Sequence, residues 1–117
     1  MTLRLQKNQT NVIVLTLKEL QTLENPNWLF VFYNEENLLN YQSVILTDLS
    51  TETARYNEFE LVLPTDLDLS VTGDYILEVY EQTSAVNLDP EQADNLCETD
   101  KVLLIGTPTT EYFYSVN

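Results

Sequence analysis

The chain has 117 residues and is strongly acidic, with five Lys and Arg residues against 19 Asp and Glu residues and a formal net charge of −14. That length suits one domain over residues 1–117, and 44% apolar residues are enough for a buried core. The acidity argues against nucleic acid as a partner, because like charges repel the phosphates. No apolar run reaches the roughly 18 residues of a membrane span, and Met1–Arg4 lacks the apolar centre of a secretion signal. We therefore expect a protein made in a cytoplasm, with no membrane partner.

The charge is unevenly distributed along the chain. The first 18 residues hold Arg4, Lys7 and Lys18 and no acid, whereas the rest holds two basic residues and all 19 acids. Solubility is one interpretation of such an acidic body, because acidic surfaces keep proteins dispersed. Complementarity to a basic surface on a partner protein is the other.

Alternation of apolar and polar residues predicts β-strands along most of the chain. The first strand contains Leu3 and Leu5. The runs Val12–Leu17 and Trp28–Tyr33 are apolar on both faces, which is typical of central strands whose second face is covered by another element or another molecule. Further strands are expected at Ser43–Leu46, Phe59–Leu63, Asp74–Glu81, Lys101–Ile105 and Thr110–Val116, with turns at Asn25–Asn27, Asn34–Asn40, Asp48–Thr53 and Pro64–Thr72. About seven or eight short strands predict a single all-β domain, an antiparallel immunoglobulin-like β-sandwich.

Two segments favour helix over strand. Lys18–Leu23 is rich in helix formers and is expected to make one helical turn. Asp89–Leu96 begins with a capping aspartate followed by proline, which predicts a short helix inside the loop of residues 84–100. Loops of this length are often functional, although a loop without a function is the alternative. The candidate contact residues in it are Asn87, Asp89 and Pro90.

The strand after Gly73 contains a tyrosine with a predicted structural role. Immunoglobulin-like sandwiches often use a tyrosine at this corner, with a buried ring and a hydroxyl that hydrogen-bonds to upstream backbone. We expect Tyr75 to fill this role, with the hydroxyl bound somewhere in Leu67–Val71.

The sequence offers few groups for catalysis. It has no histidine, which removes the usual general base and the commonest transition-metal ligand. Cys97 has acidic residues on both sides, which raise the pKa of a thiol and make it a poor nucleophile. Gly73 and Gly106 are the only glycines and lie too far apart for a phosphate-binding loop. A carboxylate pair is still compatible with a hydrolase, but we expect no enzyme, no catalytic residue and no cofactor.

Calcium is the one ion that the composition suits, because its ligands are carboxylate and amide oxygens. Thr65–Asp68 and Asp89–Asp100 carry several such groups. Neither segment has EF-hand spacing, so we interpret both as solvated acidic loops and expect no metal site.

Aromatic residues gather in the last predicted strand. Tyr112, Phe113 and Tyr114 place large rings on both of its faces. A strand tucked between the sheet and a covering loop is one interpretation. An interface with another protein is the other, because exposed Tyr and Phe are common interface anchors.

Most of the chain between Asn8 and Ile105 resembles a group of small virion proteins from tailed phages and prophages of Bacteroidetes, including crAss-like phages. The most specific block is Tyr-Glu-Gln-Thr-Ser at 80–84 with Asn-Leu-Asp-Pro at 87–90. The resemblance implies an auxiliary capsid protein, located in the virion and bound in many copies to the outside of the major capsid lattice. The implied partners are the major capsid protein or other virion proteins. The segments that carry the resemblance are Asn8–Leu17, Asn25–Phe32, Ala54–Phe59 and Tyr80–Pro90.

The charge distribution suggests an orientation on such a shell. We expect Arg4 and Lys7 to face the capsid or a neighbouring copy and the acidic loops to face water. Two alternatives stay open. One is an immunoglobulin-like module of the phage neck, collar or tail. The other is a small carbohydrate- or host-surface-binding module that uses the aromatic strand and the 87–100 loop.

Overall fold

A computed structural model describes residues 2–52, 55–63, 65–69 and 72–106. Within these residues the chain forms seven strands and one short 3-10 turn. The elements are β1 (Thr2–Gln6), β2 (Thr10–Leu15), β3 (Asn27–Asn34), β4 (Asn37–Leu46), β5 (Asn57–Val62), β6 (Gly73–Gln82), η1 (Pro90–Gln92) and β7 (Asn95–Ile105). The strand predicted at Thr110–Val116, with the candidate contacts Tyr112, Phe113 and Tyr114, lies outside the described residues.

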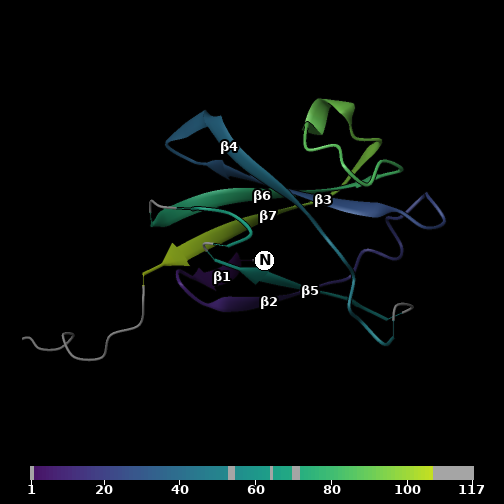
Figure 1. Ribbon diagram of the computed structural model, residues 1–117, viewed down its shortest axis with the longest axis horizontal. Coiled ribbons are helices and arrows are strands. Elements are labelled where there is room, and N and C mark those ends of the chain that lie inside the picture. Colours follow the sequence, from purple (N-terminus) through teal and green to yellow (C-terminus); the bar gives the residue numbers. More distant parts are fainter. Residues whose placement is uncertain (1, 53–54, 64, 70–71, 107–117) are drawn as a thin grey trace, which may run out of the picture.

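The strands form two layers, which confirms the predicted sandwich (Figure 1). One layer has five strands in the order β1-β7-β6-β3-β4, and the other consists of β2 and β5. The run β7-β6-β3-β4 matches the GFCC′ order of an immunoglobulin variable domain, and β2 and β5 correspond to strands B and E. The chain therefore has an immunoglobulin-like topology in which the second layer is reduced to two strands.

One pairing differs from the predicted antiparallel arrangement. β1 lies parallel to β7, with Thr2 opposite Lys101 and Gln6 opposite Ile105, so the larger sheet is mixed. The cause is the short turn after β1, where Asn8 has a φ of 60°, a left-handed conformation that asparagine tolerates well. This turn sends β2 into the other layer, so β1 pairs instead with the last described strand, which runs in the same direction.

The core lies between the two layers. Trp28, Phe30 and Phe32 project inward from β3, and all three are almost fully buried. Phe30 meets Phe59 of β5 edge to face, with 4.7 Å between ring centroids. Trp28 occupies the strand on which antibody domains keep a buried tryptophan, and here it packs against the same Phe59, with 6.5 Å between centroids. Aromatic packing from opposite layers thus joins the sheets without a disulfide.

The outer face of β3 is also buried, as its sequence predicts. Leu29 and Val31 point away from the core and are still 0% exposed. The connection between β6 and β7, residues 83–94, folds above this face of the sheet (Figure 1). Ser43 of β4, the register partner of Val31, donates a 2.6 Å hydrogen bond from its hydroxyl to the carbonyl of Leu88 in that connection.

For Val12–Leu17, no element of the described structure provides such cover, and cover by another molecule stays a prediction. Ile13 and Leu15 are buried, but Val12 is 57% and Val14 50% exposed. In the described structure, β2 belongs to a layer whose outer face no other element covers. This strand is therefore apolar on both sides although only one side faces the core.

The helix predicted over Asp89–Leu96 is reduced to the single 3-10 turn η1. Asp89 caps it as expected, accepting a 2.9 Å hydrogen bond from the backbone N–H of Glu91. The residues after it extend β7, because Asn95 pairs with Glu81 at the far end of β6. Ladder bonds to a long neighbouring strand outweigh the local helix propensity of a few residues.

Two further segments differ from their predicted structure. Lys18–Leu23 contains no helical turn, and the segment has only a turn in which Leu20 N–H donates to the carbonyl of Leu17 at 2.9 Å. β4 already begins at Asn37, inside the predicted turn Asn34–Asn40, because β3 and β4 are joined by a tight connection.

Candidate interaction surfaces

Basic residues from both ends of the described chain lie along the β1–β7 pair. Arg4 lies opposite Leu103, and Thr2 lies opposite Lys101, so Arg4 and Lys101 share one face of the β1–β7 pair. Both side chains are exposed, and neither forms an ion pair within the described residues. Lys7 follows β1 directly, and its backbone N–H donates to the carbonyl of Ile105 at 3.0 Å. We call Arg4, Lys7 and Lys101 the basic end.

Arg4 and Lys7 stand out in the sequence as candidate contacts, but Lys101 does not. No local signal connects residue 101 with residue 4. Only the parallel pairing of β1 with β7 brings them together.

The connection of residues 83–94 contains the predicted contacts Asn87, Asp89 and Pro90. Asn87 has a structural role, because its amide donates 2.8 Å and 2.9 Å hydrogen bonds to the side-chain oxygen of Gln82 and the carbonyl of Asp89. Asp89 is exposed and caps η1, and Pro90 is half-buried. The most exposed apolar side chains here were not predicted: Val86 is 81% and Leu88 51% exposed.

Tyr75 lies in β6 with its ring in the core, 5% exposed, which confirms the predicted burial. The predicted hydrogen bond from its hydroxyl to backbone in Leu67–Val71 stays a prediction.

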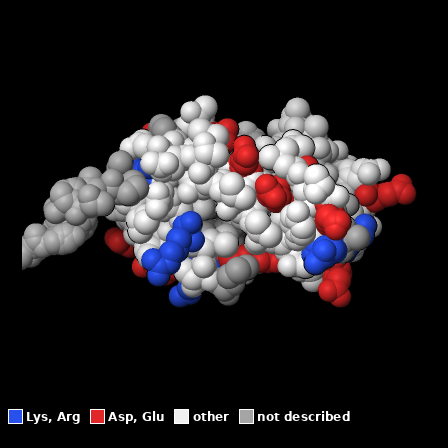
Figure 2. All heavy atoms as spheres, turned by 90° about the horizontal axis from the view of Figure 1, so that it is seen from below, with Lys and Arg blue, Asp and Glu red and all other residues white. Residues whose placement is uncertain are grey.

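The outer face of the two-stranded layer is a third exposed surface. Figure 2 looks onto this side of the molecule, where uncharged atoms cover much of the surface and Lys and Arg atoms lie near both ends. Val12 is opposite Glu60 and Val14 is opposite Glu58 in the β2–β5 pair. We call the outward side chains of β2 and β5 the small-sheet face.

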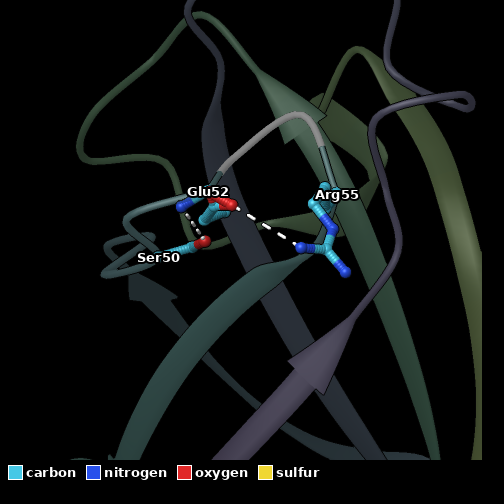
Figure 3. Close-up of polar contacts among 3 residues, drawn as sticks. All are labelled: Ser50, Glu52 and Arg55. Carbon is cyan, nitrogen blue, oxygen red and sulfur yellow. Dashed lines mark hydrogen bonds and ion pairs between the residues drawn. The ribbon is translucent and has the colours of Figure 1, made fainter.

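Ser50, Glu52 and Arg55, three residues of the connection before β5, lie close together (Figure 3). The Glu52 backbone N–H donates to the Ser50 hydroxyl at 2.9 Å, and the Arg55 guanidinium lies 3.7 Å from the Glu52 carboxylate. The Arg55 side chain is 78% exposed, so this ion pair contributes little to stability.

Two acidic side chains of β7 turn toward the interior. Asp100 is 7% exposed, and its Oδ2 is buried without a hydrogen-bond partner within the described residues. Burial, together with the hydrogen bond and the charge of Asp100, raises the pKa of the neighbouring Glu98 to about 7. Glu98 is consequently protonated over part of the neutral range.

Cys97 has a raised pKa, as the sequence indicates. Burial is the largest cause, and the charge of Glu81 adds to it, giving a pKa of about 11. The thiol is therefore protonated and weakly nucleophilic at neutral pH.

Within the described ranges, no three acidic or cysteine side chains come together where they could hold a metal ion. That part of the chain also has no helix of the length and apolarity needed to cross a membrane. Comparisons with protein families, curated proteins and solved structures found no match to this chain.

Proposed function

We propose that this protein is a non-enzymatic structural component of a virion, an auxiliary capsid protein bound to the outside of the major capsid shell. The observation that carries the proposal is the resemblance of residues 8–105 to small virion proteins of tailed phages. The fold supports it, because a sandwich with its apolar residues packed between two layers leaves broad, solvent-facing surfaces for contacts with other proteins.

The basic end supports a specific orientation on the shell. Arg4, Lys7 and Lys101 gather around β1 and β7, while the chain as a whole carries a net charge of −14. A molecule with this asymmetry approaches an acidic surface with its basic end first, because complementary potentials steer the encounter. In this orientation the basic end contacts the capsid.

Binding to emptied capsids tests the orientation. R4E/K7E is expected to weaken binding at least about tenfold, because two attractive contacts become repulsive. K18E/R55E is the matched control, since it changes the net charge equally at two exposed residues outside the basic end. Equal binding by R4E/K7E and the parent would show that the basic end does not contact the shell.

Copy number tests the location in the particle. Quantitative mass spectrometry of purified virions is expected to find this chain and the major capsid protein in a ratio of order one, because a lattice protein binds at repeated sites. A ratio of one to a few tens would instead indicate the neck, collar or tail. Absence from the particle would end the virion proposal.

A further inference from the structure

The two edges of the small sheet differ in whether their outward backbone groups have hydrogen-bond partners. Leu63 N–H donates to the carbonyl of Gln9 at 3.1 Å, which makes these residues a hydrogen-bonded pair and sets the alternation along β2 and β5. By this alternation, Asn11, Ile13 and Leu15 direct their backbone groups toward β5. The backbone groups of the residues between them point away from β5, to the free edge.

The free edge of β5 is capped by its own chain. Glu58 N–H donates to the Asp48 carboxylate at 3.0 Å, and the Glu58 carbonyl accepts a 2.7 Å bond from Leu49 N–H. Val62 N–H donates to the Asp66 carboxylate at 2.7 Å, and its carbonyl accepts a bond of the same length from Asp66 N–H. A new strand would have to displace these bonds, so this edge is protected against pairing.

The free edge of β2 has no such protection. The backbone groups of Thr10, Val12 and Val14 point outward and have no partner within the described residues. From Thr10 to Leu17 the chain has no charge, no proline and no glycine, the features that usually block edge pairing. Val12 and Val14 stand beside this edge, 57% and 50% exposed. An uncharged apolar edge strand is a template for another strand.

We propose that β2 pairs with β2 of a second copy, antiparallel and around a two-fold axis at Ile13. This register places Val12 opposite Val14 of the second copy and Thr10 opposite Thr16. Val12 and Val14 direct their backbone groups toward each other, as a hydrogen-bonded antiparallel pair requires. Thr16 follows β2 directly, and the alternation continues through it, because Leu17 N–H again points to the β5 side, where it donates to the Asn57 side chain. A one-residue slip would break this match. The result is one continuous sheet of β5-β2-β2-β5 across two copies.

Charge favours a second copy at this edge over contact elsewhere on the molecule. With a net charge of −14, two copies repel each other over most of their surfaces. The β2 strand has no acid, and the nearest charges along the chain on either side of it are Lys7 and Lys18. Contact at β2 therefore brings uncharged side chains together. This inference does not depend on the proposed virion function, since association of the isolated protein is measured without a capsid.

The proposed register can be tested by placing like or opposite charges at positions 12 and 14 of the two copies. Sedimentation velocity of the full chain measures the dimer. The parent is expected to show a concentration-dependent dimer between about 1 and 100 μM. V12K/V14K and V12E/V14E should each weaken the dimer at least about tenfold, because the register sets like charges opposite each other. Mixing the two variants should restore a dimer, since each lysine then faces a glutamate.

Controls and a second measurement keep the test decisive. V86K/L88K makes the same charge change on the exposed 83–94 connection and is expected to leave the dimer intact. Amide hydrogen exchange should show Val12 and Val14 protected at high protein concentration and exposed on dilution. This measurement uses the parent chain, so it decides the question even if V12E/V14E does not fold.

Several results would overturn the proposal. A parent chain that stays monomeric would exclude pairing at β2. A dimer that persists in V12K/V14K would also exclude it and would indicate pairing at another sheet edge, such as β1 or β4. Dissociation of V86K/L88K would show a general effect of charge. Protection of Val12 and Val14 in the monomer would mean that another part of the same chain covers the edge.

Discussion

Glu81 is a fully buried carboxylate that joins three parts of the chain. It accepts hydrogen bonds from Thr22 N–H and Leu23 N–H at 2.9 and 3.0 Å, from the Thr22 hydroxyl, and from the Asn95 amide at 3.0 Å. Burial raises the pKa of Glu81, but these hydrogen bonds together outweigh it, so the pKa lies below its usual value. The ionised form is thus part of the folded structure.

E81Q is expected to lower the free energy of unfolding by about 1–3 kcal/mol, because a neutral amide has one acceptor oxygen for several partly buried hydrogen bonds. Urea denaturation at neutral pH measures the loss. E24Q makes the same chemical change at an exposed residue of the neighbouring loop and should stay within about 0.5 kcal/mol of the parent. Similar unfolding midpoints for E81Q and E24Q would contradict this role of Glu81.

Glu98 and Glu81 respond to pH in opposite directions. The pKa of Glu98 is raised from 4.5 to about 7, so its contribution to stability is complete below pH 4.5 and is lost as pH rises through about 7. The pKa of Glu81 is lowered, so its contribution is complete above pH 4.5 and is lost as pH falls below that value. We expect E98Q to be as stable as the parent near pH 4.5 and more stable at about pH 8.

Because Glu98 is partly exposed, solvent screening should limit the increase in the free energy of unfolding of E98Q at about pH 8 to about 1 kcal/mol or less. Urea midpoints of the parent and E98Q near pH 4.5 and at about pH 8 test this, since the difference between them cancels groups that titrate in both. E91Q, at an exposed residue, is the control and should follow the parent at both values. An equal pH response of E98Q and the parent would contradict the raised pKa.

Among the elements, the 83–94 connection depends on one pair of side-chain amides. Gln82 is 1% exposed and donates to the carbonyls of Ser84 and Asn87 at 3.1 and 2.9 Å. Asn87 returns a 2.8 Å hydrogen bond to the Gln82 side-chain oxygen. The connection is thereby held over the outer face of β3.

N87A is expected to lower the free energy of unfolding by about 1–3 kcal/mol, because it leaves the buried oxygen of Gln82 without its donor. Thermal unfolding followed by circular dichroism measures the change. V86S, at the most exposed apolar residue of the same connection, should change stability by less than about 0.5 kcal/mol. If N87A were as stable as V86S, the amide pair would not hold the connection in place.

At the scale of the whole molecule, acidic charge opposes folding. A net charge of −14 on 117 residues produces self-repulsion, which salt screens. Raising NaCl from about 20 to about 200 mM is expected to raise the thermal midpoint by a few degrees. E35Q/E36Q, at exposed residues of the β3–β4 connection, removes two charges and should show a smaller rise. A midpoint that falls with salt would show that attraction outweighs repulsion among the charges.

Much of the fold was predictable because its signals are local. Alternation at Leu3 and Leu5 and along residues 59–63 arises from strands with one buried face, and the structure has both strands. Helix signals at Asp89 and Pro90 were correctly located, but they produced only one turn. The hydrogen bonds between β6 and β7 limited the length of that turn. A local sequence pattern does not report these bonds, because they join residues that are far apart in the sequence.

The candidate surfaces were less predictable, because they depend on strand pairing between distant parts of the chain. Arg4 and Lys7 stand out in the sequence, and Val12 and Val14 could be read only as part of a strand. Which charges share a face depends on the pairing of β1 with β7, whose partners lie about a hundred positions apart.

Whether the β2 edge is free likewise depends on the number of strands in its layer. The capping of β5 depends on hydrogen bonds that the Asp48 and Asp66 carboxylates accept from its backbone. Side-chain alternation reports which residues face the core, because it follows from the geometry of a single strand. It does not report which strand lies beside which, because that choice is made by backbone hydrogen bonds between distant segments.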